Sequence, residues 1–477
     1  MYNVNTMTYK KFLKSVFVLA LPVALQNLLT TSGSMVDTIM LGNLSEIAVG
    51  AVGLCAQFTS LMLSCYWGLL GCGILFFSQY YGAKDHKGIT RSYGMMLTCM
   101  MTIAVIFGVL AVLFPEFVMS VYTDKEVYKE VGVKYLRIVG FAYPLQVYSV
   151  AASGILRSTE NVKTPLYASI ASVFSNMFLN WVFIFGNLGA PKMGVEGAAL
   201  ATLLASVINV TVVLILCKKQ NFYYLFRFKE HFTWDKEHAK EYFKKGLPII
   251  CNELALGVSN LIINVVLGRQ ATEAIAALAV FRTFEGLIIS FFTGFSSASS
   301  VLVGNRVGAG KHDEAFQIAN RCVYLCAGTI FVVCINLVIF HAPILKIMGL
   351  SGASFDYATR MLIVFCIIAV LRMSNWISND TCRASGDSIT GTFMEISFMY
   401  VLNIPLLCLG GLVWHLPFII VFIFTYIDEP IRYILMQIHM HSGGWIRPVT
   451  KAGRDALPEF RKEHPLKFFF TKMGLSE

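Results

Sequence analysis

Twelve stretches of mostly apolar residues alternate with short polar connections between Ser15 and Gln437. Each is long enough for a membrane-spanning α-helix, which needs ~20 apolar residues. They cover residues 15–41, 51–79, 92–114, 133–156, 165–186, 195–217, 246–268, 274–303, 320–341, 357–382, 390–413 and 415–438. Because the runs are continuously apolar rather than alternating, they predict helices and not the strands of a membrane barrel.

The two halves of this pattern repeat each other. Leu21-Pro22 recurs as Leu247-Pro248, Leu41-Gly42 as Leu267-Gly268, Tyr81-Gly82-Ala83 as Val307-Gly308-Ala309, Arg157 as Arg383 and Thr164 as Thr390, always at the constant offset that carries Pro22 onto Pro248. Positions related by this offset are called equivalent. Duplicated hydrophobic halves with a site between them are typical of secondary transporters. The pattern therefore predicts an all-α polytopic membrane protein of twelve transmembrane helices in two six-helix repeats. We expect the repeats at residues 1–217 and 246–438, a basic linker at 218–245 and a tail at 439–477.

Composition and charge agree with this interpretation. Hydrophobic residues make up 56% of the 477 residues and charged residues 14%, which is more apolar side chain than a soluble domain can cover. Lysine and arginine gather in the N-terminal segment, the second connection and the 218–245 linker, all on one side of a twelve-span arrangement. Both termini are therefore predicted to be cytoplasmic. The same asymmetry, together with a basic tail, accounts for the net charge of +10, so no nucleic-acid partner is expected.

Two other features of the sequence have simple interpretations. The first apolar run continues for about 26 residues, which is too long for the core of an export signal, and is interpreted as the first helix. The twelve cysteines include no Cys-x-x-Cys pair, so we expect small buried thiols rather than a metal site or disulfides.

Ionisable residues inside the spans are the first candidates for function, because a charged side chain there usually faces a cavity or a partner. Asp37 lies among small and hydroxyl residues, which would admit water or a cation to its carboxylate; the alternative is an acid exposed at the outer end of the helix. Glu253 follows Pro248 by five residues, about 10 Å into its span. It either binds a proton or sodium ion or bonds neighbouring helices. The two acids do not occupy equivalent positions.

Other polar pairs are weaker candidates. Arg282 and Glu285 are three residues apart on one helix face and are expected to form a structural pair, although Glu285 could join Glu253 in a cation-attracting cavity. Asn176 and Asn180 lie one turn apart and either coordinate a cation or bridge helices. Glu395 is a further, weaker candidate.

Taken in order, the motifs make the chain resemble the multidrug and toxic compound extrusion (MATE) transporters over residues 19–449. The motifs are Leu21-Pro22 with Asp37 and Leu41-Gly42, Gln79-Tyr80-Tyr81-Gly82-Ala83, Gly154-Ile155-Leu156-Arg157-Ser158-Thr159, Gly246-Leu247-Pro248 with Glu253, Val303-Gly304-Asn305-Arg306-Val307-Gly308, Arg383-Ala384-Ser385-Gly386-Asp387 and Gly443-Gly444-Trp445-Ile446-Arg447-Pro448-Val449. The resemblance implies two six-helix lobes around a central cavity that alternates between outward-open and inward-open states and exports organic compounds against an inflow of sodium ions or protons.

The resemblance also implies roles for individual residues. Asp37 matches the first-helix aspartate that takes the coupling cation, Glu253 approximates the seventh-helix acid, and Asp387 matches an acid implicated in coupling in some members, although an ordinary loop acid fits that position equally. Asn176 fits the network around the first-helix aspartate. Asn180 stands where an archaeal-type branch has aspartate, which leaves the coupling ion, H⁺ or Na⁺, open.

The expected function is therefore cation-coupled export of organic, cationic or amphiphilic compounds by a monomer in the cell membrane. The alternative is a lipid or lipid-linked oligosaccharide flippase, which would need several basic residues in its cavity. Apart from the coupling ion we expect no cofactor and no resident metal, and the sequence shows no catalytic cluster of an enzyme. The tail is expected to be disordered or to form a surface helix, with Phe468-Phe469-Phe470 touching lipid.

Overall fold

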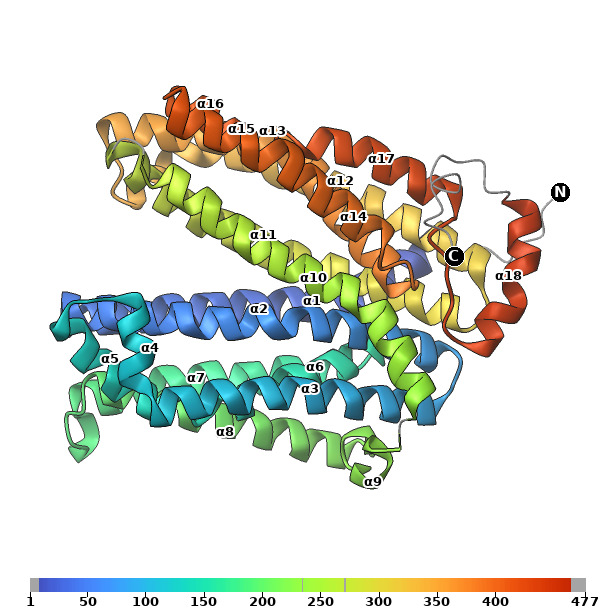
Figure 1. The fold of residues 1–477 in the computed structure, drawn as a ribbon, viewed down its shortest axis with the longest axis horizontal. Helices are drawn as coiled ribbons and strands as arrows, with labels where there is room; N and C mark the ends of the chain where they lie inside the picture. The colour runs from blue at the N-terminus through green and yellow to red at the C-terminus, as the bar shows by residue number, and fades with distance from the viewer. Residues whose placement is uncertain (1–7, 234, 270–271, 465–477) are drawn as a thin grey trace. The chain divides into compact units, whose positions relative to one another are not determined.

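The structure is a computed structural model that describes residues 8–233, 235–269 and 272–464, and all regular structure within these ranges is helical (Figure 1). The long helices are α1 (Tyr9–Gly42), α2 (Glu46–Gly82), α3 (His86–Leu113), α7 (Lys163–Phe185), α8 (Val195–Lys219), α10 (Lys236–Leu267), α11 (Thr272–Gly308), α12 (His312–Ile347) and α13 (Gly352–Ala384). Shorter helices are α4 (Pro115–Tyr122), α5 (Glu126–Val139), α6 (Ala142–Ser158), α9 (Phe228–His231), α14 (Thr390–Phe398), α15 (Ile404–Cys408), α16 (Phe418–Phe424), α17 (Glu429–Ser442) and α18 (Lys451–Glu463).

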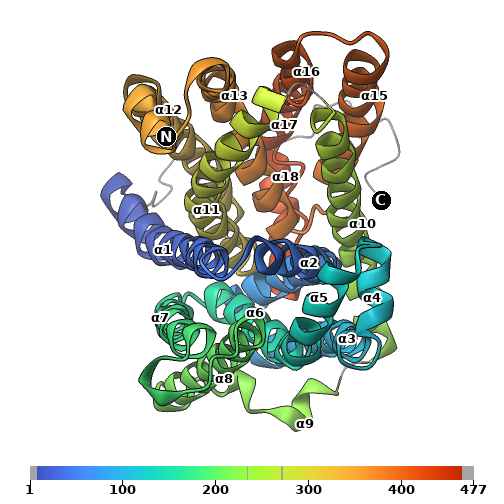
Figure 2. The ribbon, with the colours of Figure 1, turned by 90° about the vertical axis from the view of Figure 1, so that its left-hand side faces the viewer.

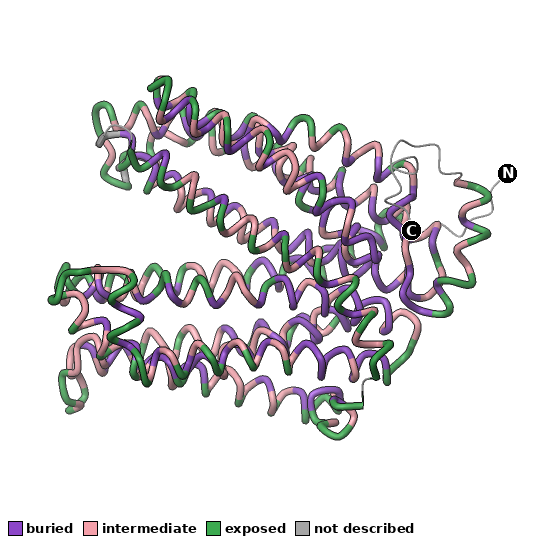
Figure 3. The backbone as a smooth tube through the Cα atoms, in the orientation of Figure 1, coloured by how far each residue is buried: buried purple, intermediate pink, exposed green. Residues whose placement is uncertain are grey.

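Ten helical segments of the described chain are long and apolar enough to cross a membrane. One of them, Thr390–Val413, joins α14 and α15 through two π-helical stretches, Met399–Asn403 and Leu409–Val413. The pair α5 and α6, bent by 54°, gives an eleventh span. Buried and exposed residues alternate along the long helices (Figure 3), and large apolar side chains such as Ile39 and Ile367 are exposed, as lipid-facing surfaces require. The predicted all-α membrane fold is confirmed.

The twelfth predicted span, residues 415–438, is broken rather than continuous. It divides into α16 and α17, with the break at residues 425–428, and Pro430 is the second residue of α17. Proline lacks an N–H group and so favours a helix start at this position. The side-chain amide of Asn403 donates to the freed Thr425 carbonyl (2.8 Å), which satisfies a main-chain group that lipid could not.

One compact unit, called here the amino-terminal unit, comprises residues 22–77 and 85–243. Within it α7 packs along α8, α8 contacts α5 and α6, and α3 contacts α6 (Figure 2). Local chemistry sets the helix ends. The Asp85 side chain caps α3 by accepting from the Gly88 N–H (2.9 Å), and Gly186, with φ of 77°, ends α7 in the left-handed conformation that glycine tolerates.

The carboxy-terminal unit comprises residues 1–21, 78–84 and 244–477. Helix α13 is its centre and packs against α11, α12, α16 and α17. The largest buried side chains of this centre include Phe281, Phe365 and Phe422, whose rings meet edge to face. This packing places the polar side chains of α13 between those of α11 and α17.

The end of α2 crosses the end of α11 within the carboxy-terminal unit. A Cβ atom on Gly82 would collide with the Asn305 carbonyl oxygen, and one on Gly308 with the Gln79 carbonyl oxygen. Both glycines are therefore required for the close approach of two backbones. Gly82 and Gly308 occupy equivalent positions of the two repeats, as do Gln79 and Asn305. The two repeats thus contact each other through equivalent positions.

Part of the predicted tail is an ordered helix that packs on this crossing. The Val449 N–H donates to Gln79 Oε1 (2.8 Å), and the Thr450 hydroxyl donates to the Gly308 carbonyl (2.7 Å). Thr450 also caps α18, whose Phe460 is buried. The predicted lipid contact of Phe468-Phe469-Phe470 lies outside the described residues.

Candidate functional site

Asp37 of α1 lies against two asparagines of α7 in the amino-terminal unit. The Asn180 amide nitrogen donates to Asp37 Oδ1 at 2.7 Å. Asn180 is buried, and its own Oδ1 has no hydrogen-bond partner among the described residues. The 3.6-residue period of α7 puts Asn176 one turn away on the same face. Helix packing therefore places the predicted asparagine pair of α7 next to the predicted aspartate of α1.

The Asn176 side chain also faces this carboxylate. Its amide nitrogen donates to Asp37 Oδ1 (2.8 Å) and to Asp37 Oδ2 (3.1 Å). Two neutral amides therefore donate to one carboxylate, which stabilises the carboxylate inside the helical unit without cancelling its charge.

An apolar cluster covers one end of this site. It consists of Leu41, Ile184 and Ala198, with Tyr135 packed against it. Leu41 follows Asp37 by four residues and Ile184 follows Asn180 by four, so each lies one helical turn beyond its polar neighbour. Packed apolar side chains therefore follow the polar group by one helical turn toward the ends of α1 and α7.

A second polar group of the amino-terminal unit has residues at equivalent positions in the carboxy-terminal unit that also contact one another. Gln26 Nε2 donates to Ser169 Oγ (2.9 Å), and Arg157 Nη2 donates to Gln26 Oε1 (2.7 Å). The residues at the equivalent positions are Asn252, Glu395 and Arg383. There, Asn252 Nδ2 donates to Glu395 Oε2 (2.9 Å), and Arg383 Nη2 lies 3.6 Å from the same oxygen. The bond donated by the amide is repeated, with a carboxylate in place of a hydroxyl as its acceptor, whereas the arginine contacts the amide in the first repeat and the carboxylate in the second.

Glu253 belongs to this charged version of the triad. Arg383 Nη1 lies 3.2 Å from Glu253 Oε1 and 3.5 Å from Asp380 Oδ1. One guanidinium group is therefore shared by Glu253, Asp380 and Glu395. Asp380 and Arg383 come from α13, Glu253 from α10 and Glu395 from α14, so four charged groups from three helices meet at one place.

The ion pairs continue along α13 and α17. Arg432 binds Glu395 (2.8 Å) and Asp428 (3.2 Å), and Arg372 binds Glu285 (2.5 Å) and approaches Glu429 (3.9 Å). Arg282 pairs with Glu285 at 2.7 Å, as the sequence predicted. In total the connected network holds six carboxylates, Glu253, Glu285, Asp380, Glu395, Asp428 and Glu429, and four guanidinium groups, Arg282, Arg372, Arg383 and Arg432. With all groups ionised, the carboxylates of this network outnumber its guanidinium groups by two among the described residues, and such an excess of negative charge attracts protons or cations.

Asp387 lies in a separate cluster between α13 and α14. It is fully buried and accepts hydrogen bonds from the Thr390 hydroxyl (3.0 Å) and His439 Nε2 (2.8 Å), with Arg447 3.4 Å away. Burial alone raises the pKa of Asp387, but the His439 hydrogen bond and the charges of His439 and Arg447 outweigh it and lower the pKa to about 2. The equivalent pair in the first repeat is neutral: Asn161 Oδ1 accepts from the Thr164 hydroxyl (3.0 Å).

A family model described as MatE matches residues 22–182 and 248–409. The two matched segments begin at equivalent positions, so each repeat matches the model by itself. The chain belongs to the MATE family. It is therefore a multi-pass membrane transporter, as the sequence motifs indicated.

Individual MATE relatives are similar along most of their length. An uncharacterized transporter, YisQ, of Bacillus subtilis (strain 168) is 25% identical over 442 residues, which cover 91% of this chain and 95% of that protein. The multidrug resistance protein NorM of Vibrio cholerae is 26% identical over 320 residues, covering 65% of this chain and 68% of NorM. A crystal structure of MATE in complex with MaL6 matches with a TM-score of 0.81 at 17% identity, covering 92% of this chain and 99% of that one. This last match concerns the fold alone.

Several residues of the charged network were not predicted from the sequence. Asp380, Asp428, Glu429 and Arg432 all lie in or next to predicted spans, and none was selected. A signal was present: the position equivalent to Asp380 is Gly154 and that equivalent to Glu395 is Ser169, so the second repeat gains charge where the first is neutral. Comparison of the repeats, position by position, finds these residues.

Proposed function

We propose that this MATE transporter is a cation-coupled antiporter that exports organic, cationic or amphiphilic compounds, with Asp37 as the residue that binds the coupling proton or Na⁺. The observation that supports this is the three-residue group around Asp37, whose carboxylate accepts hydrogen bonds from the amides of Asn176 and Asn180. Neutral amides hold the carboxylate without cancelling its charge, so it can still load and release a cation. The buried Asn180 Oδ1 has no hydrogen-bond partner in the part of the chain that the structure describes, so an amide oxygen of the same group is open to a cation.

The proposed cycle follows from the two charge states of Asp37. A proton or Na⁺ arriving from outside neutralises Asp37, which weakens the hydrogen bonds that its carboxylate accepts from α7, and the contact between α1 and α7 rearranges. Pro22, inside α1, lacks a backbone donor and gives the helix a point at which to bend. Ion binding and substrate binding are mutually unfavourable in this scheme, so the ion gradient drives export. The distribution of lysine and arginine supports a cell-membrane location with both termini cytoplasmic.

The other candidate residues receive different roles. The uncompensated charge of the network around Glu253 supports a role in attracting cations to the carboxy-terminal unit. The contacts of Asp387 with Thr390, His439 and Arg447 support a structural role that joins the α13–α14 turn to the tail. Arg282 and Arg372 are both paired with Glu285, which argues against the basic cavity that a flippase for pyrophosphate-linked lipids requires.

The test is transport of a fluorescent organic cation, ethidium, in everted membrane vesicles, with pH and Na⁺ gradients imposed separately. In such vesicles, efflux from the cell corresponds to uptake into the lumen. Asp37→Asn keeps the size of the side chain and removes its charge, so we expect gradient-driven efflux to be lost. Ser34→Ala is the matched control, because Ser34 lies one turn earlier on α1 and its hydroxyl only donates to the Thr31 carbonyl. The gradient, of pH or of Na⁺, that drives ethidium transport by the parent protein identifies the coupling ion. Equal efflux in the parent and Asp37→Asn would exclude the proposed role of Asp37.

A further inference from the structure

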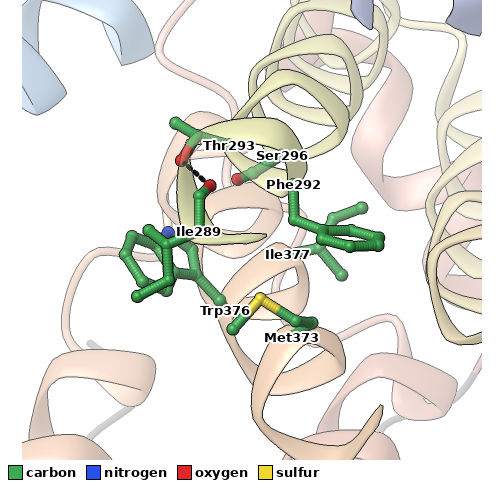
Figure 4. A pocket seen from close by; sticks show the side chains of 7 residues that line it. All are labelled: Ile289, Phe292, Thr293, Ser296, Met373, Trp376 and Ile377. Carbon is green, nitrogen blue, oxygen red and sulfur yellow. Dashed lines mark hydrogen bonds between the residues drawn. The ribbon is translucent and has the colours of Figure 1, made fainter. Parts of the chain in front are cut away.

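A small hollow lies between α11 and α13 of the carboxy-terminal unit (Figure 4). Its apolar wall consists of Ile289 and Phe292 from α11 and Met373, Trp376 and Ile377 from α13. The open space inside is about that of one water molecule. The Trp376 side chain remains partly exposed, so a ligand that fills the hollow can extend across its ring.

Two hydroxyl groups, from Thr293 and Ser296, also line the hollow. The Thr293 hydroxyl donates within its own helix to the Ile289 carbonyl (2.7 Å), as the dashed line in Figure 4 shows. The Ser296 hydroxyl instead donates to Asp380 Oδ2 (2.5 Å), which also accepts from Trp376 Nε1 (3.0 Å). Because the Ser296 hydroxyl proton is used in this hydrogen bond, the Ser296 oxygen can only accept a hydrogen bond from a further donor.

The charge behind Ser296 is negative. Arg383 lies 3.5 Å from Asp380 Oδ1, but the same guanidinium group also serves Glu253 and Glu395. The surrounding network has two more carboxylates than guanidinium groups. A positive guest is therefore favoured, and the aromatic ring of Trp376 adds a face that attracts cations.

We propose that this hollow is a subsite for the protonated amine of an exported compound. The ammonium N–H donates to Ser296 Oγ, whose own proton is held by Asp380, and the apolar body of the compound lies against Trp376 and Phe292. An –NH₃⁺ group has about the size of the water molecule that the hollow can hold. A trimethylammonium group is larger and has no N–H to donate, so the subsite selects amines that carry a proton.

This inference deepens the proposed export function by naming a substrate class, and its test does not depend on transport. The purified full chain in detergent is titrated calorimetrically with 2-(1-naphthyl)ethylammonium and with its N,N,N-trimethyl analogue, which share charge and aromatic body. We expect the primary amine to bind about tenfold more tightly or better, the usual consequence of one hydrogen bond to a charged group. Equal affinity, or preference for the trimethyl compound, overturns the proposal.

Single substitutions test which residues cause the preference for the primary amine. Ser296→Ala and Asp380→Asn should each abolish the preference, while Ser374→Ala keeps it, because the Ser374 hydroxyl only donates to Val370 in the same helix. Melting temperatures establish that each variant is folded, and Ser296→Ala decides the matter if Asp380→Asn is not. A preference that survives Ser296→Ala overturns the proposal. Asp37→Asn should retain the preference, so lost export with intact selectivity bears on Asp37, and lost selectivity in the parent bears on the subsite alone.

Discussion

At the scale of single residues, the arginines at one pair of equivalent positions have different partners in the two repeats. Arg157 donates to the neutral Gln26, whereas its repeat partner Arg383 is shared by Glu253, Asp380 and Glu395. Removing an arginine from a buried ionic group leaves the carboxylates without compensation, which costs far more than a lost bond to an amide. The two positions are therefore a matched pair for measuring what the charge in the second repeat contributes.

We expect Arg383→Gln to destabilise the protein by about 3–5 kcal/mol and Arg157→Gln by no more than about 2 kcal/mol. The melting temperature in detergent should fall clearly further for Arg383→Gln. Adding Glu253→Gln to Arg383→Gln should recover part of the loss, because it removes one of the carboxylates left without a partner. Similar melting temperatures for the two single variants would mean that the carboxylates around Arg383 are neutral in the folded protein.

The candidate site was predictable where a single residue carries the signal. Asp37, Asn176 and Asn180 are polar residues inside apolar runs, and the sequence alone selects them. Their contact was not predictable from spacing, because it depends on how α1 packs on α7. Glu253, Glu285 and Glu395 of the network around Arg383 were also selected, but Asp428, Glu429 and Arg432 were overlooked. They lie in a span that hydropathy averages into one apolar helix, although the structure breaks it there.

At the scale of elements, apolar length was sufficient to predict the long helices, since each must satisfy its own backbone in lipid. It was insufficient where a distant side chain relieves that requirement. Asn403 donates to the Thr425 carbonyl across 22 residues, and this bond permits the break between α16 and α17. The bend between α5 and α6, at Gly140 and Phe141, likewise divides a span that hydropathy reads as continuous.

The crossing of α2 and α11 gives a prediction about elements. Gly308→Ala places a methyl group on the Gln79 carbonyl oxygen, so the helices must separate, and we expect a lower melting temperature and reduced transport. Gly328→Ala is the control in the neighbouring helix α12, because a Cβ atom there meets nothing within 4 Å. It should be neutral or stabilising by about 0.5–1 kcal/mol, the usual gain of alanine over glycine in a helix. Equal effects of the two substitutions would contradict a close backbone crossing.

At the scale of the whole molecule, the two repeats share several contacts between equivalent positions but differ in their polar side chains. The pairs Gly82 and Gly308, Gln26 and Asn252, and Thr164 and Thr390 keep equivalent contacts in the two repeats. The group around Asp37 is not duplicated: the positions equivalent to Asp37, Asn176 and Asn180 hold Ile263, Leu402 and Leu406. The two repeats thus keep these contacts but only the first has the polar group around Asp37. This difference is expected if only the first repeat binds the coupling ion at this position.

This asymmetry predicts that the proposed coupling site cannot be moved by transferring the aspartate alone. Ile263→Asp in an Asp37→Asn background should restore no gradient-driven efflux, because the equivalent neighbours are leucines and the new carboxylate lacks the two amides that donate to Asp37. Ile263→Asp by itself should keep efflux and lower the melting temperature, since an unpaired carboxylate in an apolar environment is costly. The everted-vesicle assay and thermal unfolding measure both. Restored efflux in the double variant would show that position within the repeat, rather than the asparagine partners on α7, makes a carboxylate a coupling site.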